Sequence, residues 1–368
     1  MNICTLFKSL YLRRQFPPNI VFFVTSRCSM KCRTCFYRNK MNNSSVNNEL
    51  SIDEIENIAK KYKNAFLLSL SGGEPFMRDD LADICVLFNK YSNTRYIDIP
   101  TNASDPDKIS QIVRDILERS SGLYLQIDLS LDGIGELHDT IRGCSGSYEL
   151  LIKTYDMLST LKNRHDNLKI KINTTFSHFN QASIIGMCED ISMIFPSIDF
   201  FSINYIHGRP FDIKAADVDP RIFKEVSKKL DRAARSAGNF TDKLIFTVQK
   251  LTREIIYDTV ISEKSVLQCR ALKKLLVIDE TGEVFPCEPF FDKKLGNLRD
   301  NDYDIRKILD SRTAKDFYKN HLESGECFCN WGCAATNNII FNPKGLAKLL
   351  DRFLNVKKRL PSPAKPVS

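Results

Sequence analysis

Three cysteines stand close together near the start of the chain, in the sequence Cys28-Ser-Met-Lys-Cys32-Arg-Thr-Cys35. They directly follow an apolar run at 20–24 and share one short segment, so their thiolates can converge on a single soft metal centre. A sulfur triplet suits an iron–sulfur cluster or zinc. Zinc needs a fourth ligand close by, and neither cysteine nor histidine follows until Cys85. We therefore favour a cluster, whose fourth iron three protein ligands would leave open.

A second group of cysteines lies late in the chain. Its members are Cys269, Cys287, Cys327, Cys329 and Cys333. The first two enclose Gly282 in a C-x12-G-x4-C pattern. One [4Fe–4S] cluster takes four thiolates, so five cysteines can hold one such cluster with one thiol in surplus but cannot hold two. A structural zinc hairpin is the alternative interpretation.

The composition indicates an ordinary globular chain, with 43% hydrophobic and 27% charged residues in 368. No apolar run is long enough to cross a bilayer, and residues 1–14 do not resemble a signal peptide. Eight of the twelve cysteines fall in the two metal-like groups, which favours metal binding in a reducing cytoplasm over a disulfide scaffold. The net charge of +8 is spread along the chain, so nucleic-acid binding is not predicted.

Strand-like and helix-like segments alternate over residues 18–210. The expected strands are 20–24, 65–70, 96–99, 123–131, 169–175 and 199–205. Such alternation predicts parallel β/α units with site residues at the carboxyl ends of the strands. Six units are too few for an eight-fold barrel, so we expect an α/β fold with a partial, TIM-like (β/α)6 barrel. A helical bridge and a small cysteine-rich module with a hairpin at 275–285 follow.

The turn Gly72-Gly-Glu-Pro75 follows the second expected strand and offers a close backbone approach and a carboxylate. Together with the cysteine triplet it resembles the radical S-adenosylmethionine (SAM) superfamily. In that family the open iron of a [4Fe–4S] cluster chelates SAM, and the Gly-Gly-Glu turn holds the amino group of SAM. The resemblance therefore implies Gly72, Gly73 and Glu74 as SAM-binding residues.

Further motifs extend the resemblance along the chain. Asn102 lies in Pro100-Thr-Asn-Ala103, where the family usually has glycine in place of the alanine. Ser130, in Ser-Leu-Asp-Gly133, is implied at the ribose or methionine end of SAM. Arg142 is implied to bind the SAM carboxylate, since a guanidinium binds carboxylates through two hydrogen bonds. An aromatic residue is common in the family where Thr34 stands, which leaves the adenine contacts to the backbone and side chains near Phe36 and Tyr37.

The late cysteines resemble the SPASM and twitch extensions of this superfamily, which carry auxiliary [4Fe–4S] clusters. A full SPASM pattern has about seven cysteines for two clusters, and one cluster follows here from the four thiolates that each requires. The resemblance implies Cys269, Cys287 and Cys333 as ligands, with Cys327 or Cys329 as the fourth.

The implied domains are an N-terminal extension (1–19), the radical SAM partial barrel (20–210), a helical bridge (211–265), the SPASM/twitch-like domain (266–342), and a C-terminal helix with a disordered tail (343–368). The implied function is reductive cleavage of SAM to a 5′-deoxyadenosyl radical, hydrogen abstraction from a substrate, and oxidation or crosslinking of that substrate with help from the auxiliary cluster. Cys28, Cys32 and Cys35 would be the catalytic cluster ligands.

The substrate stays open between a peptide and a small or lipid-linked molecule. A reductant such as flavodoxin or ferredoxin is the expected partner, in the cytoplasm. An apolar stripe from Leu346, followed by basic residues 357–359, and residues 10–14 offer a membrane-surface contact, but core packing is the favoured interpretation of the stripe. The alternative function is a non-enzymatic iron–sulfur or zinc protein for binding or electron transfer, which would need no SAM site.

Overall fold

The computed structural model describes residues 16–41, 48–233, 240–325 and 327–355. The basic residues 357–359, the predicted tail and the segment 10–14 lie outside the described residues. The strands are β1 (Asn19–Thr25), β2 (Leu67–Gly72), β3 (Tyr96–Thr101), β4 (Tyr124–Ser130), β5 (Leu168–Phe176), β6 (Phe200–Tyr205), β7 (Leu275–Ile278), β8 (Glu283–Phe285) and β9 (Gly296–Asn297).

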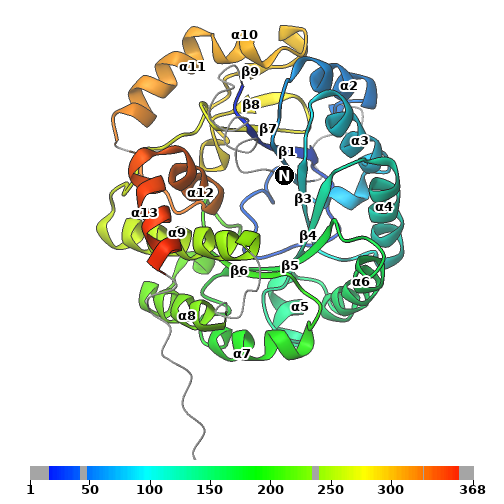
Figure 1. Cartoon of the computed structure of the whole chain (residues 1–368), viewed down its shortest axis with the longest axis vertical. Coiled ribbons are helices and arrows are strands. Elements are labelled where there is room, and N and C mark those ends of the chain that lie inside the picture. The colour runs from blue at the N-terminus through cyan, green and yellow to red at the C-terminus, as the bar shows by residue number, and fades with distance from the viewer. Residues whose placement is uncertain (1–15, 42–47, 234–239, 326, 356–368) are drawn as a thin grey trace, which may run out of the picture.

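The first six strands pair in parallel in the order β6-β5-β4-β3-β2-β1, and helices alternate with them along the chain. The helices are α2 (Ile52–Lys61), α3 (Leu81–Tyr91), α4 (Pro106–Arg119), α5 (Glu136–Arg142), α6 (Ser147–Lys162), α7 (Ile184–Ile194), α8 (Pro220–Ala233), α9 (Phe240–Ser262), α10 (Ile305–Leu309), α11 (Arg312–Phe317), α12 (Gly332–Phe341) and α13 (Pro343–Asn355). The strands curve around a centre with helices outside them (Figure 1).

Alternation along the strands separates an apolar outer face from a more polar inner face. Ile97 and Ile99 of β3 belong to the main core, which the outer helices share. Asp98, between them, is only partly buried and lies on the other face. β5 repeats the pattern, with buried Ile170 and Ile172 on either side of Lys171. Packing against the outer helices therefore requires every second residue to be apolar and leaves the inner face free to carry polar groups.

The cysteine-rich module extends the same sheet. β7 pairs in parallel with β1, and β8 and β9 continue antiparallel, as the hairpin at 275–285 predicts. The pairing of β7 with β1 is not predicted by the sequence pattern. Val21 and Phe23 of β1 pack with Val277 of β7 and with Trp331, immediately before α12, in a second apolar cluster on the inner face.

α12 packs against α9 and α13, and α9 contacts β6. The carboxamide of Asn19, which shares its face of β1 with Val21, donates to Asn337 Oδ1 of α12 at 2.7 Å. The hydrogen bond between Asn19 and Asn337 and the packing of Trp331 against β1 place one side of α12 against the inner face of the sheet. The stripe on α13 is mixed, because Leu349 is buried whereas Leu350 is 52% exposed.

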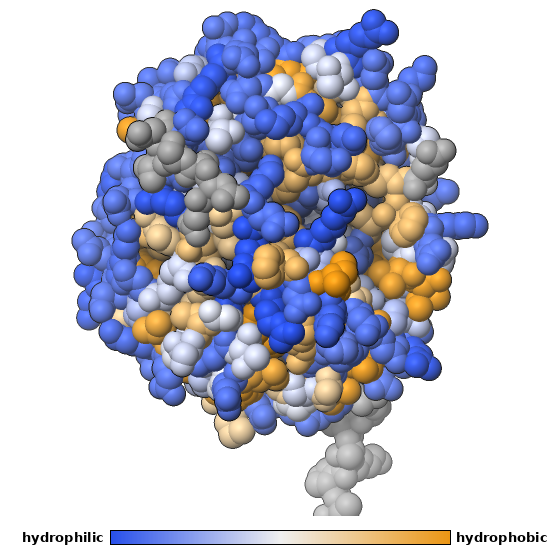
Figure 2. All heavy atoms as spheres, turned by 180° about the vertical axis from the view of Figure 1, so that it is seen from behind, coloured by the Kyte–Doolittle hydropathy of each residue, from blue (hydrophilic) through white to orange (hydrophobic). Residues whose placement is uncertain are grey.

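Within the described residues, no helix is both long and apolar enough to cross a membrane. The face opposite to that of Figure 1 is largely hydrophilic, with its apolar atoms in separate patches (Figure 2).

Candidate functional site

The cysteine segment 28–35 follows β1 and is held from the side of β2 by the Gly-Gly-Glu turn. Gly73 N donates to Thr25 O at 2.8 Å, and Glu74 N donates to Arg27 O at 2.7 Å. A Cβ atom on Gly72 or Gly73 would lie 2.2 Å from Thr25 O or 2.1 Å from Arg27 O. The glycines are therefore required by the close approach of two backbone segments, whatever else the turn binds.

Two other segments hold the cysteine loop from the opposite side. Arg33 N donates to Ile141 O of α5 at 2.9 Å, and Phe211 N, after β6, donates to Cys35 O at 3.0 Å. Gly143 ends α5 with φ 62°, and a Cβ atom there would meet Lys31 O at 2.7 Å. These contacts place Arg142, the last residue of α5, beside the loop.

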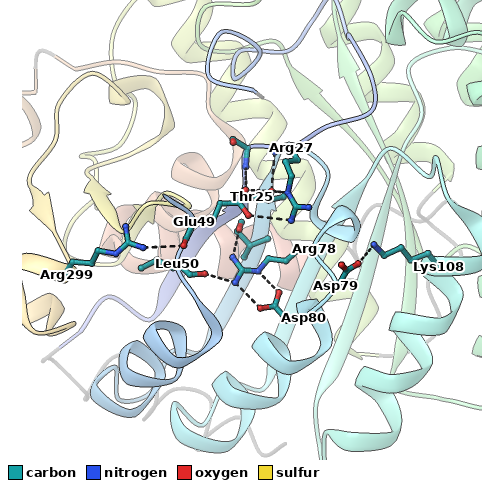
Figure 3. A network of polar contacts seen from close by, with 11 residues as sticks. Thr25, Arg27, Glu49, Leu50, Arg78, Asp79, Asp80, Lys108 and Arg299 are labelled. Carbon is teal, nitrogen blue, oxygen red and sulfur yellow. Dashed lines mark hydrogen bonds and ion pairs between the residues drawn. The ribbon is translucent and has the colours of Figure 1, made fainter. Parts of the chain in front are cut away.

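A buried polar network fixes the point where β1 ends (Figure 3). The Arg78 guanidinium donates to Val24 O at 2.8 Å and to Leu50 O at 2.6 Å, and it pairs with Asp80. The Glu49 carboxylate accepts from Ser26 N at 3.2 Å and from the Thr25 hydroxyl. The loop is thus anchored before its first cysteine.

One cavity of about 200 Å³ lies where these segments meet. Its lining includes ten of the eleven residues predicted for the SAM-binding cluster site: Cys28, Cys32, Cys35, Phe36, Gly72, Gly73, Glu74, Asn102, Ser130 and Arg142. The segments that supply them are β1, β2, β3, β4 and α5 with their following loops. The cavity therefore lies at the carboxyl ends of parallel strands, as predicted.

The carboxylate of Glu74 is buried at this cavity and already accepts hydrogen bonds. Its oxygens accept from Thr101 Oγ1 at 2.9 Å and from Asn102 N at 2.6 Å. Burial raises the pKa of Glu74 to about 7 in spite of these donors. A cation placed beside it would remove part of that cost and favour the ionised form.

The Arg142 side chain is largely buried between Asp132 and the cysteine loop. Its Nη2 lies 3.0 Å from Asp132 Oδ2, and its Nη1 lies 3.8 Å from Cys32 Sγ. Its Nε has no hydrogen-bond partner among the described residues. A buried donor without a partner is unfavourable, so this guanidinium is available to an anionic group in the cavity.

Sequence reasoning missed Asp132, although it lies in the Ser130–Gly133 motif that was used for Ser130. Besides its pairing with Arg142, Asp132 accepts from Thr175 N at 2.9 Å. The cavity also includes Asn173 and His207, which no motif marked. Their only sequence signal is their position at the carboxyl ends of β5 and β6.

The segment 138–148, which contains Arg142, supports the structure of the site. Burial lowers the pKa of His138 to about 3, and its neutral ring accepts from Asp132 N at 3.2 Å. The Asp139 carboxylate accepts from Gly146 N, from Tyr148 N and from the Ser147 hydroxyl at the start of α6. These two residues therefore fix the loop and helix around Asp132.

Tyr37 is the exception among the predicted cofactor residues. Its hydroxyl donates to Glu280, and its ring lies 4.8 Å from that of Phe23, in the inner apolar cluster. Its side chain is absent from the cavity lining that the described residues form. β1 and the hairpin turn enclose the Tyr37 ring, so an adenine contact near this position would come from the backbone or from Phe36. Phe36 does line the cavity.

The alanine that departs from the family pattern has a strained backbone. Ala103 adopts φ 63°, in the left-handed region where glycine is favoured. It is fully buried, and its N–H donates to Thr101 Oγ1 at 3.0 Å. The usual glycine is explained by this conformation, and Asn102 keeps its place beside Cys28.

The donor set fits an iron–sulfur cluster. Three thiols from one loop border one cavity, and Asn102 Nδ2 lies 3.7 Å from Cys28 Sγ as a further N–H donor to sulfur. Burial raises the pKa of Cys28 to about 11 and that of Cys35 to about 12. Cluster binding would replace these protons with iron, and N–H groups near the sulfurs tune such clusters.

Four of the late cysteines surround a second cavity, of about 280 Å³: Cys269, Cys287, Cys327 and Cys329. Burial, followed by the charges of the other three thiols, raises the pKa of Cys287. Four thiols match the requirement of one cubane cluster.

Cys333 does not join this set. It is absent from the second cavity's lining among the described residues. Burial and then the carboxylates of Glu288, Asp98 and Asp128 raise the pKa of its thiol, against Lys171. Cys333, at the first turn of α12, thus lies apart from the other four, and its assignment as an auxiliary ligand stays a prediction. Cys327 and Cys329 both border the second cavity.

Comparison with known proteins shows two matching families. Residues 22–181 match the Radical SAM superfamily, and residues 269–334 match SPASM, described as an iron–sulfur cluster-binding domain. The first range holds the cysteine triplet, and the second holds all five late cysteines.

Relatives of known function match over part of their length. The chain is 25% identical over 235 residues to pre-heme d1 synthase of Dinoroseobacter shibae, covering 60% of this chain and 52% of that protein. It is 26% identical over 231 residues to GTP 3′,8-cyclase of Staphylococcus aureus, covering 56% and 65%. The chain thus spans about half to two thirds of the length of these two relatives.

Solved structures share the fold. The structure of anSMEcpe with bound AdoMet aligns with a TM-score of 0.60 at 15% identity, covering 94% of this chain and 96% of that one. Streptococcus suis SuiB bound to the precursor peptide SuiA aligns with a TM-score of 0.60 at 17% identity, covering 89% and 74%. The prediction of a partial barrel followed by a C-terminal iron–sulfur module is confirmed.

Proposed function

Because the chain belongs to the radical SAM superfamily and carries a SPASM iron–sulfur domain, we propose that it is an enzyme that cleaves SAM reductively and oxidises or crosslinks its substrate. Membership implies a [4Fe–4S] cluster and SAM as cofactors, with auxiliary iron–sulfur ligation in the SPASM domain. When bound, the reduced cluster and SAM supply a 5′-deoxyadenosyl radical for hydrogen abstraction. The protein must hold the cofactors, orient them and exclude quenching.

One observation carries the proposal: three thiols, a buried carboxylate and a buried guanidinium border the same small cavity. Cys28, Cys32 and Cys35 would hold the cluster. The Glu74 carboxylate would accept from the ammonium group of SAM, and Arg142 Nε would donate to its carboxylate. Ser130 and the loop at Phe36 would border the ribose and the adenine.

We assign one auxiliary cluster to Cys269, Cys287, Cys327 and Cys329. We propose that the substrate is oxidised overall, because a cluster held by these four thiols would supply an acceptor for the electron of the substrate radical. The oxidoreductase class and the number of auxiliary clusters belong to the proposal. A protein for electron transfer alone is less well supported, since it would have no use for Glu74 and Arg142 at the cluster cavity.

For the substrate we retain a peptide or a small molecule. SuiB, whose structure was solved with a bound precursor peptide, has a similar fold. This similarity of fold alone supports a peptide substrate. A flavodoxin or ferredoxin is the proposed reductant. The proposed division stays at 20–210 for the barrel and 266–342 for the auxiliary domain, although β7 adds to the barrel sheet.

The test is 5′-deoxyadenosine formation by reduced, reconstituted protein. Replacing Cys28, Cys32 and Cys35 together by alanine should abolish it while the protein stays soluble. Undiminished SAM cleavage by that variant would refute the assignment.

A further inference from the structure

Charged side chains lie on the inner face of the sheet, directly before the residues that line the cofactor cavity. Asp98 precedes Pro100 by two positions on β3, and Asp128 precedes Ser130 by two on β4. Lys171 stands in the same relation to Asn173 on β5. Because side chains two residues apart share a face of a strand, these three form a layer next to the cavity. We call Asp98, Asp128 and Lys171 the inner layer.

The inner layer holds more negative charge than positive. Lys171 Nζ lies 2.6 Å from Asp128 Oδ2, so the positive charge of Lys171 is already paired. Asp98 accepts from the Ser69 hydroxyl at 2.7 Å, and no ion pair joins it to another described residue. Burial and the neighbouring Asp128 raise the pKa of Asp98. A carboxylate in this setting is stabilised by a cation, and Lys171, the cation nearby, is already paired with Asp128.

A second acceptor points to the same chemistry. Asn19 is 7% exposed, and its Oδ1 has no hydrogen-bond partner among the described residues. It shares the inner face of β1 with Val21 and Phe23. Its amide nitrogen is occupied by Asn337 of α12, whose own nitrogen donates to Cys333 O at 2.9 Å. A buried acceptor without a donor is costly, so a donor-rich ligand fits this face.

The start of α12 faces this layer. Cys333 retains accessible surface, and the charges of Glu288, Asp98, Lys171 and Asp128 act on its thiol. The Glu288 carboxylate lies 2.9 Å from His207 Nε2, within hydrogen-bonding distance. His207 in turn lines the cofactor cavity. The inner layer, the start of α12 and the cofactor cavity are therefore neighbours.

Resting on the proposed function, we propose that the inner layer is the substrate-recognition end of the reaction site and that Asp98 binds a positively charged group of the substrate. A primary ammonium or a guanidinium would form a charge-assisted hydrogen bond with the Asp98 carboxylate. An anion is disfavoured, because it would have to compete with Asp128 for Lys171. Either a peptide side chain or a small amine carries the required group.

The probes are n-butylammonium, the neutral n-butanol and the anionic butyrate, titrated into reconstituted, SAM-bound protein by calorimetry. We expect n-butylammonium to bind at least about tenfold more tightly than either, as a buried charge-assisted bond implies. Acetyl-Gly-Lys-Gly-amide and glucosamine then distinguish a peptide source from a small amine. The proposal would be overturned by the wild-type protein alone if butyrate bound as tightly as n-butylammonium, or if neither compound bound.

Two variants should change the affinity for n-butylammonium in opposite directions. Asp98→Asn should weaken n-butylammonium binding at least about tenfold, whereas Lys171→Met should strengthen it, because Asp128 loses its internal cation. An anion site would instead lose butyrate when Lys171 is replaced. Asp115→Asn, on the exposed face of α4, is the matched control for non-specific amine binding. Unchanged binding by Asp98→Asn refutes the site.

These experiments distinguish a failure of the proposed function from a failure of the proposed amine site. SAM cleavage by the wild-type protein, measured without amine, tests the proposed function alone. Selective amine binding that depends on Asp98 in a protein unable to cleave SAM would refute the function and keep the site. Cleavage without selective amine binding would do the reverse.

Discussion

Cys333 differs from the other four late cysteines in its surroundings. The other four surround one cavity, whereas acidic and basic residues of the barrel strands and Glu288 act on Cys333. Its spacing from Cys329 resembles a ligand pair, but the start of α12 separates the two. Side-chain direction at a helix start cannot be deduced from cysteine spacing.

The position of Cys333 apart from the other four late cysteines predicts that its thiol is dispensable for the auxiliary cluster. In a background with Cys28, Cys32 and Cys35 replaced by alanine, Cys333→Ala should retain about four irons per chain, as one cubane requires. Cys329→Ala in the same background should retain less iron than Cys333→Ala, because the auxiliary cluster loses one of its four thiolate ligands. Anaerobic iron analysis after reconstitution measures both. The opposite ranking of these two variants would restore the sequence-based assignment, and bound zinc in place of iron would support the structural-hairpin alternative.

Arg142 is expected to contribute directly to SAM affinity. Arg142→Lys keeps the charge but loses the planar fork and Nε, so the dissociation constant for SAM should rise at least about tenfold. Equilibrium dialysis with labelled SAM measures it. Arg119→Lys, at a surface ion pair on α4, is the matched control and should not change affinity. Equal affinity of Arg142→Lys and wild type would show that another residue holds the SAM carboxylate.

At the level of single residues, the sequence motifs predicted ten of the cavity residues because each motif lies in one short turn. Asn173 and His207 were missed because each is marked only by its strand end, whereas Asp132 was missed although it lies in the Ser130–Gly133 motif. The position of the Tyr37 ring depends on β7 and β8, more than two hundred residues away in the chain. Contacts of that kind are not encoded in local spacing.

Arg78 joins several elements at the end of β1. Its buried side chain connects Val24, Leu50 and Asp80, and the cysteine loop begins at the next turn of the chain (Figure 3). Replacing it would leave two carbonyl oxygens and a carboxylate without their donor. The loop would then lose its anchor before Cys28.

We expect Arg78→Met to lower the free energy of unfolding by about 3 kcal/mol, the usual cost of breaking a buried charge network. Anaerobic urea denaturation of the reconstituted protein measures the change. The control is Lys108→Ala, which removes the pair with the exposed Asp79 and should cost at most about 0.5 kcal/mol. Similar losses for both variants would contradict a buried anchor.

Element types were largely predictable, because periodicity and caps are local. Ser51 and Glu54 form a capping box at the start of α2, and the six barrel strands alternate with helices as expected. The addition of β7 beside β1 was not predicted, since a four-residue apolar strand carries no signal for its partner. Its burial on both faces is explained by a position between β1 and β8.

For the whole molecule, one sheet runs through the barrel and the cysteine-rich module. β1 carries the cysteine loop at its end, and β7, its neighbour, leads into the hairpin that precedes Cys287. The two cysteine cavities are therefore attached to adjacent strands. The proposed net oxidation requires electron transfer between the reaction site and an auxiliary cluster in the second of these cavities.

The most direct measurement is the amount of 5′-deoxyadenosine formed from SAM by anaerobically reconstituted, dithionite-reduced protein. The account predicts its formation by wild type and by a Cys144→Ala/Cys188→Ala control, whose cysteines border neither cavity. It predicts none from the variant with Cys28, Cys32 and Cys35 replaced by alanine. Equal formation by all three proteins, or none by reduced wild type that has taken up iron and binds SAM, would contradict the account.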